Sequence, residues 1–167
     1  MPDRILIASD HAGFELKQQL GDELRAAGLD VADLGPTDAT ATDYADYAHP
    51  LARAVAEGRA ERGVLLCGTG LGMSYAANRW PGVRAAVAWR PEVAVLARQH
   101  NDANVLVLPA RFLNAEEGAA ILRAWLETPF DGGRHARRVA KIERVETDVA
   151  TATSDDEHDA PHGEDDR

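Results

Sequence analysis

The chain has 167 residues, of which 45% are hydrophobic, and this is enough for one domain with a full core. Its single cysteine excludes an internal disulfide, and no apolar run is long enough for a membrane span or a signal segment. We therefore expect a protein of the reducing cytoplasm, with neither a membrane nor a nucleic acid as partner.

The net charge of −10 is concentrated at the C-terminal end. Residues 147–167 hold eight acidic residues and one arginine, a net −7, whereas residues 1–146 are nearly balanced. No large apolar residue follows Val149, so this segment cannot bury enough surface to offset the entropy of ordering it. We expect one domain over 1–146 and a disordered acidic tail over 147–167. The tail is either a solubilising extension or a docking segment.

Five short apolar runs predict strands. Their nearly continuous apolar character is typical of a parallel sheet that is covered on both faces. The runs are Ile5–Ser9, Leu29–Leu34, Val64–Cys67, Ala85–Ala88 and Val105–Leu108.

Apolar residues at helical spacing lie between these runs. They are Leu16, Leu20 and Leu24 before Gly28; Val93 and Leu96; and Ile121, Leu122, Trp125 and Leu126. A last helix is expected from Arg134 to about Val149, where Val139, Ile142 and Val145 or Glu146 form a stripe that could cover a partner subunit or the protein's own sheet. The alternation predicts an α/β fold, a Rossmann-like three-layer αβα sandwich with a parallel sheet of about five strands.

Polar residues follow the first and third strands. In a doubly wound sheet, ligands bind outside the carboxyl ends of the strands, where the winding direction reverses, and we expect these two strands to flank that point. Residues 9–13, Ser-Asp-His-Ala-Gly, would then share one crevice with residues 67–70, Cys-Gly-Thr-Gly.

Cys67 ends a buried strand and opens a glycine-rich turn, Gly68-Thr69-Gly70-Leu71-Gly72. Backbone N–H groups at such a turn can hold an anion and favour a thiolate. The alternative is an inert buried cysteine beside a plain strand-to-helix connection. A nucleotide site is disfavoured because the glycine spacing is wrong and no lysine follows the last glycine. A metal site is disfavoured because His11, His49, His100 and His135 are scattered and the cysteine has no second ligand nearby.

Six segments in order carry a family resemblance. They are residues 9–14 (SDHAGF), 42–44 (TDY), 67–72 (CGTGLG), 76–78 (AAN), 98–102 (RQHND) and 132–135 (GGRH). From about Arg4 to Val145 the chain resembles type B ribose-5-phosphate isomerase, whose family also includes the galactose-6-phosphate isomerase subunits. The resemblance implies a Rossmann-like homodimer, or a dimer of dimers, with active sites shared between subunits and no metal or organic cofactor.

The resemblance also implies roles for individual residues in an aldose–ketose isomerisation through a cis-enediolate. Cys67 would be the base and His100 the acid that opens the sugar ring, with Thr69 and His11 nearby. Asp10 and Asn101 would hold hydroxyls, and the backbone of Gly68, Gly70, Leu71 and Gly72 would contact the substrate. Arg111, Arg134 and Arg138 would grip the phosphate, the last two from the neighbouring subunit.

Two positions depart from the family pattern. Met73 stands where one branch of the family has a glutamate base, which leaves Cys67 as the base here, and Ala45 stands where a proline often follows the tyrosine. The expected reaction interconverts ribose 5-phosphate and ribulose 5-phosphate. The alternatives are galactose 6-phosphate, allose 6-phosphate or erythrulose 4-phosphate as substrate, or a non-catalytic sugar-phosphate sensor.

Overall fold

Five parallel strands form the centre of the protein, in the order β2-β1-β3-β5-β4. The structure, a computed structural model, describes residues 4–143. The strands are β1 (Ile5–Ser9), β2 (Val31–Asp33), β3 (Arg62–Cys67), β4 (Ala85–Val87) and β5 (Val105–Pro109). The expected three-layer αβα sandwich is confirmed, and all five predicted strands are present.

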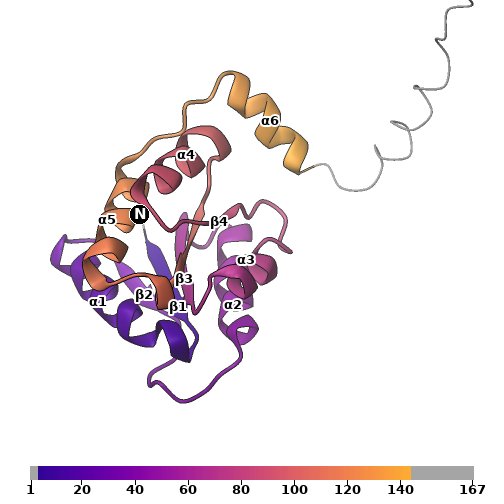
Figure 1. Ribbon diagram of the computed structural model, residues 1–167. Helices are drawn as coiled ribbons and strands as arrows, with labels where there is room; N and C mark the ends of the chain where they lie inside the picture. Colours follow the sequence, from indigo (N-terminus) through magenta and orange to yellow (C-terminus); the bar gives the residue numbers. More distant parts are fainter. Residues whose placement is uncertain (1–3, 144–167) are drawn as a thin grey trace, which may run out of the picture.

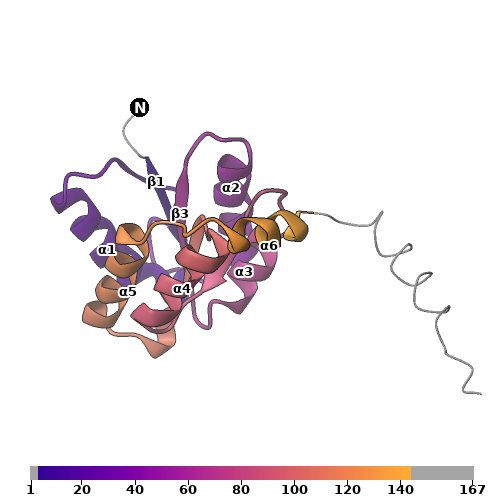
Figure 2. The same cartoon turned by 90° about the horizontal axis from the view of Figure 1, so that it is seen from above.

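Helices cover both faces of this sheet (Figures 1 and 2). One face carries α1 (Phe14–Ala26), α4 (Pro91–Asn101) and α5 (Ala115–Glu127), and the other carries α2 (Tyr44–Ala56) and α3 (Leu71–Ala77). Two 3₁₀ turns, η1 (His11–Gly13) and η2 (Ala110–Phe112), follow β1 and β5. The last helix, α6 (Arg134–Ile142), packs against α4 beyond the sheet (Figure 1).

The strand bounds differ slightly from the apolar runs because pairing, not hydrophobicity, ends a strand. β2 keeps only three residues, since register with β1 runs from Ile5↔Val31 to Ile7↔Asp33. β3 starts at Arg62, two residues before its apolar run, because Arg62 pairs with Ile5 and Gly63 with Val105. β1 lies between β2 and β3, so the winding direction reverses there as expected.

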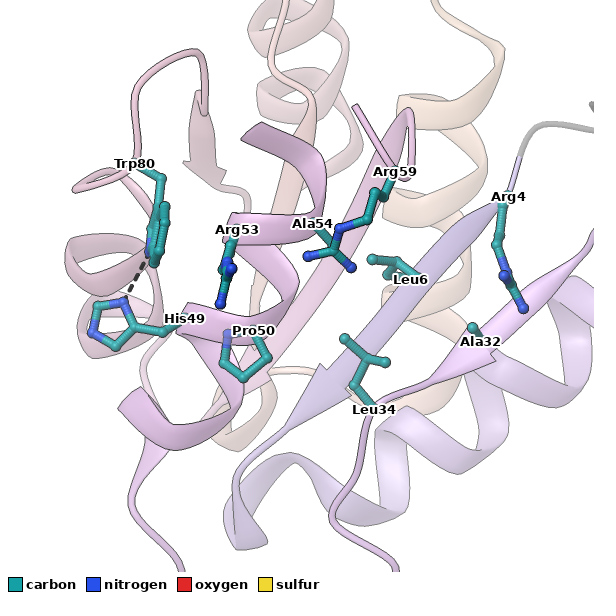
Figure 3. Close-up of a pocket in the computed structure, with 10 residues that line it drawn as sticks. All are labelled: Arg4, Leu6, Ala32, Leu34, His49, Pro50, Arg53, Ala54, Arg59 and Trp80. Carbon is teal, nitrogen blue, oxygen red and sulfur yellow. Dashed lines mark hydrogen bonds between the residues drawn. The ribbon is translucent and has the colours of Figure 1, made fainter. Parts of the chain in front are cut away.

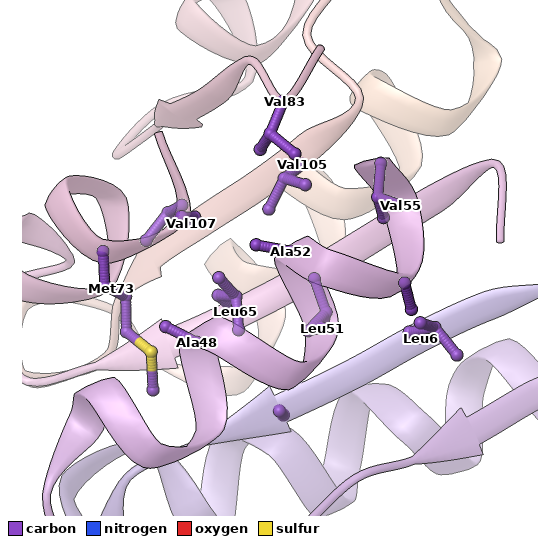
Figure 4. Packing of buried hydrophobic residues seen from close by; sticks show 14 of the residues in the cluster. Leu6, Ala48, Leu51, Ala52, Val55, Leu65, Met73, Val83, Val105 and Val107 are labelled. Atoms are coloured by element: carbon purple, nitrogen blue, oxygen red, sulfur yellow. The ribbon is translucent and has the colours of Figure 1, made fainter. Parts of the chain in front are cut away.

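Alternate residues of the strands pack into two cores. Leu6, Leu65 and Val107 face α2 and α3, where they meet Leu51 and the fully buried Met73 (Figure 4). On the other face the cluster contains Ile5, Ile7, Val64, Leu66, Leu106 and Leu108, together with Leu20, Ile121 and Trp125 from the helices. Burial on both faces explains why these strands are apolar at nearly every position.

The helix ends depend on local chemistry. Asn114 accepts from the backbone N–H of Glu117 while the Glu117 carboxylate accepts from the N–H of Asn114, a capping box that starts α5. α6 ends at Ile142 in the described chain, whereas Val145, Glu146 and the acidic tail over 147–167 lie outside the described residues. Within residues 4–143, no helix combines the length and apolar character that crossing a membrane requires.

Candidate active site

The site begins at the carboxyl ends of β1 and β3, which lie side by side. Asp10 follows β1, and its backbone N–H donates to the carbonyl of Leu66 on β3 at 3.1 Å. Its Oδ1 accepts from the N–H of Gly13 at 3.0 Å and caps η1. Gly13 lies so close to β3 that an added Cβ would meet the backbone of Leu66 at 2.9 Å. Asp10 and His11 are therefore fixed beside the end of β3, at the edge of the sheet where the sequence predicts a crevice.

Cys67 ends β3, and its side chain is 4% exposed. Its Sγ accepts a hydrogen bond from the backbone N–H of Gly70 at 3.1 Å. Such a bond strengthens when the sulfur carries a negative charge. The loop therefore provides a donor to a thiolate, which is the arrangement expected from the residues 67–72.

Three glycines of this loop are closely surrounded, and at Gly70 the backbone conformation itself favours glycine. Gly70 has a φ of +79°, and a Cβ there would come within 3.0 Å of Val87. A Cβ at Gly68 would meet the side chain of Arg111 at 3.2 Å, and the N–H of Arg111 donates to the Gly68 carbonyl at 3.1 Å. Gly72 lies under the ring of Tyr44, 2.7 Å from where its Cβ would be. The loop is thus held between η2 and the start of α2.

Thr69 and Leu71 are exposed at the rim of the same loop, where the Thr69 Oγ1 accepts from the N–H of Leu71 at 3.3 Å. His11 forms one wall of an adjacent cavity of about 540 Å³ whose other residues are Ala41, Thr42, Asp43, Asp46 and Tyr47. The Nδ1 of His11 accepts from the backbone N–H of Thr42 at 3.3 Å, which leaves Nε2 to carry the proton of a neutral ring. The Oγ atoms of Ser9 and Thr42 are buried without a partner in the described chain.

The remaining predicted residues lie at the opposite end of the sheet. α4 runs back from the carboxyl end of β4, so His100 is about 14 Å further along the helix axis than Pro91. Asn101 lines a cavity of about 370 Å³ beside β4, together with Ile142 of α6. Glu143, just after α6, accepts from the N–H of Gly82, which precedes β4. Within one chain, His100, Asn101, Arg134 and Arg138 are therefore separated from Cys67.

His100 instead stacks on His135. The two ring centroids are 4.3 Å apart and the ring planes differ by 4°. Arg134 Nε donates to His135 Nε2 at 3.4 Å, and the N–H of Asp131 donates to the carbonyl of Gln99 at 3.1 Å. Burial lowers the pKa of His135, and the nearby His100, Arg134 and Arg138 lower it further, while Asp131 opposes them. The prediction that the histidines are scattered is wrong for this pair, because α6 folds back onto α4.

His100, Asp131 and His135 each offer a possible metal ligand, and these atoms lie within 4.8 Å of one another. The lone pairs of an imidazole nitrogen lie in the ring plane, so two parallel rings do not converge on one ion. Arg134 also donates to one of these nitrogens, and a guanidinium disfavours a bound cation. The arrangement suits an anion better than a metal.

A cavity of about 640 Å³ lies elsewhere, between α2 and the β1–β2 edge of the sheet (Figure 3). In it Trp80 Nε1 donates to His49 Nδ1 at 3.0 Å, and Arg53 and Arg59 both pair with Glu57. Neither Cys67 nor His100 lines this cavity. Volume alone therefore does not identify the site.

The structure thus brings together one group of predicted residues at the carboxyl end and a second group at the amino end. The first group is Asp10, His11, Cys67, Gly68, Thr69, Gly70, Leu71, Gly72 and Arg111; the second is His100, Asn101, Arg134 and Arg138. No role for His135 follows from the sequence, although it lies in the GGRH segment that carries the resemblance. Only the three-dimensional stack on His100 distinguishes it.

Comparisons with known proteins identify the family. Residues 5–142 match the family described as "Ribose/Galactose Isomerase". Ribose-5-phosphate isomerase B of Escherichia coli is 43% identical over 143 residues, which cover 86% of this chain and 96% of the relative.

Two solved structures extend the likeness to the fold. A ribose 5-phosphate isomerase from Thermotoga maritima is 51% identical with a TM-score of 0.82, over 84% of this chain and 97% of the other. Ribose-5-phosphate isomerase B from Mycoplasma genitalium, solved with bound ribulose-5-phosphate, is 43% identical with a TM-score of 0.82. The match covers 84% of this chain and 94% of the other. The resemblance found in the sequence is confirmed, and the chain belongs to the ribose/galactose isomerase family.

Proposed function

We propose that this chain interconverts ribose 5-phosphate and ribulose 5-phosphate, with Cys67 as the base. The observation that carries the proposal is the Gly70 N–H bond to Cys67 Sγ, in a loop that also touches Arg111. The thiolate takes the proton from C2 of the open-chain aldose and leaves an enediolate. The proton then returns at C1, while a hydroxyl proton passes from O2 to O1, so the ketose forms with no net loss of atoms or electrons.

The surroundings of Cys67 suit this chemistry. A carbon acid needs a base shielded from water, and general-base catalysis is typically worth about 10² to 10⁴ in rate. Backbone N–H groups at the start of α3 would meet the enediolate oxygen, and Asp10 and His11 follow β1, the strand next to β3. A single thiol acts as a base only when it is reduced, which fits a cytoplasmic protein.

A second copy of the chain would complete each site. We assign Cys67, Thr69, Asp10, His11 and Arg111 to one subunit, and the ring-opening acid His100 with Asn101, Arg134 and Arg138 to the other. The support is geometric, because the two groups lie at opposite ends of one sheet. The arginines suit a phosphate dianion, since a guanidinium donates two parallel hydrogen bonds.

The surface around the carboxyl end supports the same assembly. Five large apolar side chains are exposed there, on segments that follow β3, β4 and β5 or begin α2: Tyr44, Leu71, Tyr75, Trp89 and Phe112. Tyr75 is 66% exposed and Phe112 70%. An exposed apolar rim of this kind is typical of a surface that another protein covers. A homodimer, or a dimer of dimers, would bury it over the active site.

The test is turnover of ribose 5-phosphate by the wild type and by Cys67→Ala. We expect Cys67→Ala to lose isomerisation by about 10²-fold or more while it still binds the sugar phosphate, measured by calorimetry. Unchanged turnover would remove the thiol from the mechanism. Binding of the sugar phosphate by the wild type without any turnover would favour a non-catalytic sugar-phosphate sensor.

The choice of sugar needs a separate comparison, because the family description covers both ribose and galactose isomerases. Turnover of the wild type on four-, five- and six-carbon sugar phosphates, at equal concentration, decides it. We expect the five-carbon substrate to have the highest kcat/KM. A higher value for erythrulose 4-phosphate, allose 6-phosphate or galactose 6-phosphate would replace the substrate and keep the mechanism.

A further inference from the structure

His135 is the one buried histidine of the described chain, and the proposed chemistry gives it no task. It is 6% exposed, although its neighbours Arg134 and Ala136 on α6 are exposed. Its backbone N–H donates to the carbonyl of Gly132 at 2.9 Å, which fixes the first turn of the helix. Burying a polar ring removes its hydrogen bonds to water, which costs free energy. The burial of His135 therefore indicates a specific contact that offsets this cost.

That contact is the ring of His100. A centroid separation of 4.3 Å and an angle of 4° describe two rings that lie flat on each other. A stacked partner restricts rotation of the His100 ring about χ2, a torsion that is broad for histidine when nothing holds it. The backbone adds a second constraint, since the Asp131 N–H bond to the Gln99 carbonyl joins the segment before α6 to the end of α4.

We propose that His135 is a positioning residue for His100: its imidazole is a flat platform that holds the His100 ring in the orientation in which it meets the substrate. This rests on the proposed function of His100 as the ring-opening acid. Arg134 takes part as well, because its Nε donates to His135 Nε2. One phosphate-gripping arginine is thereby linked through His135 to the acid.

The charges around His135 fit a neutral platform. His100 faces it from α4, Arg134 and Arg138 from α6, and Asp131 from the segment before α6. Three of these four groups are cationic or can become so, and burial acts in the same direction, so the pKa of His135 is lowered. A neutral His135 can accept from Arg134 and stack on His100 without repelling a protonated acid.

The test uses two substitutions with opposite expectations. His135→Phe keeps a flat ring of similar size, whereas His135→Ala removes the platform. We expect His135→Ala to lower kcat roughly 10- to 100-fold with little change in KM, because misplacement of a catalytic group acts on the reaction step. His135→Phe should retain most of kcat. The matched control is His49→Ala, which removes an exposed histidine from another aromatic contact, with Trp80, and should leave kcat unchanged.

A readout without substrate separates this proposal from the proposed function. Stacked rings shift one another's proton resonances, so the His100 ring protons should move in the NMR spectrum of His135→Ala and stay near their wild-type positions in His135→Phe. Unmoved His100 resonances in His135→Ala would overturn the positioning role even if the isomerase is real. If the His100 resonances move in His135→Ala but His100→Asn is fully active, the two rings stack as proposed and His100 is not the ring-opening acid. His135 would then position no catalytic group, which also overturns the proposal. Equal losses in both His135 variants, seen in KM, would make His135 a phosphate contact and overturn the platform.

Discussion

The lowered pKa of His135 has a consequence for stability. In the unfolded chain the imidazole titrates near its usual value of about 6.5, whereas in the folded protein it takes up a proton only at lower pH. Between these two values the unfolded state binds more protons, so acidification favours unfolding. The contribution of neutral His135 to the free energy of unfolding is therefore complete above about pH 6.5. It is lost as the pH falls from there through the lowered pKa of the folded protein.

We therefore expect the free energy of unfolding of the wild type to fall more than that of His135→Phe between pH 7.5 and 5.5. Urea unfolding of both proteins at one fixed protein concentration measures this, and the fixed concentration removes any effect of subunit association. If the free energies of unfolding of the two proteins differ by the same amount at both pH values, the pKa of His135 is the same in the folded and the unfolded chain.

Gly70 allows a sharper test of the catalytic loop, because another glycine provides a matched control. Gly70 and Gly28 have similar φ values, +79° and +83°, but a Cβ at Gly28 would meet nothing within 4 Å, whereas one at Gly70 would meet Val87. We expect Gly28→Ala to cost about 1 kcal/mol of unfolding free energy from backbone strain alone. Gly70→Ala should cost more.

Gly70→Ala should also lower kcat, because relief of the contact with Val87 and of the backbone strain displaces the N–H that donates to Cys67 Sγ. Urea unfolding and turnover of the two variants give both quantities. Equal destabilisation of the two variants would show that the loop tolerates the side chain, whereas a larger destabilisation in Gly70→Ala with unchanged kcat would show that this donor has no catalytic role.

At the scale of elements, Lys17 joins α1 to the end of β2. Its side chain is 0% exposed, and Nζ donates to both carboxylate oxygens of Asp33 at 2.8 Å and to the Pro36 carbonyl at 2.7 Å. Removing one partner of a buried pair leaves the other charge uncompensated. We expect Lys17→Met to cost about 3 kcal/mol of unfolding free energy, at the low end of the range because Asp33 is partly exposed.

The control for Lys17→Met lies on the same helix. Arg25→Met removes an exposed pair with Asp22 and should cost under about 0.5 kcal/mol. Urea unfolding curves compare the two variants. A cost for Lys17→Met no larger than that for Arg25→Met would mean that the buried ammonium contributes nothing beyond an exposed one.

The elements also show what the sequence could predict. The strands are apolar on both faces, so their positions and the parallel sheet follow from the pattern. The pattern does not predict α2, although Ala48, Leu51, Ala52 and Val55 have helical spacing, because Pro50 interrupts the helical signal. The group around Cys67 was predictable, since it depends on which strands are neighbours.

The position of the second group was not predictable in the same way. His100 and His135 are 35 residues apart, and only the path of the chain after α5 brings α6 back onto α4. The separation of His100 from Cys67 follows from the direction of α4, a property of the whole sheet and not of any local segment.

At the scale of the whole molecule, the proposed sharing of sites makes two inactive variants restore each other. We mix Cys67→Ala with His100→Asn under conditions that exchange subunits, such as joint unfolding and refolding. In a mixed dimer, one site contains the intact Cys67 of the second variant and the intact His100 of the first, and the other site contains neither. Random pairing then gives about a quarter of the wild-type activity.

A site built within one chain gives the opposite result, because every site of a mixed dimer carries one substitution and the mixture stays as inactive as its parts. The control is a mixture of Cys67→Ala with Cys67→Ser, which lacks the thiol in every pairing and must stay inactive in both cases. Light scattering during size-exclusion chromatography checks that dimers form. Dimers with no restored activity would refute the shared site, and the distance between His100 and Cys67 within one chain would then also exclude them as a catalytic pair.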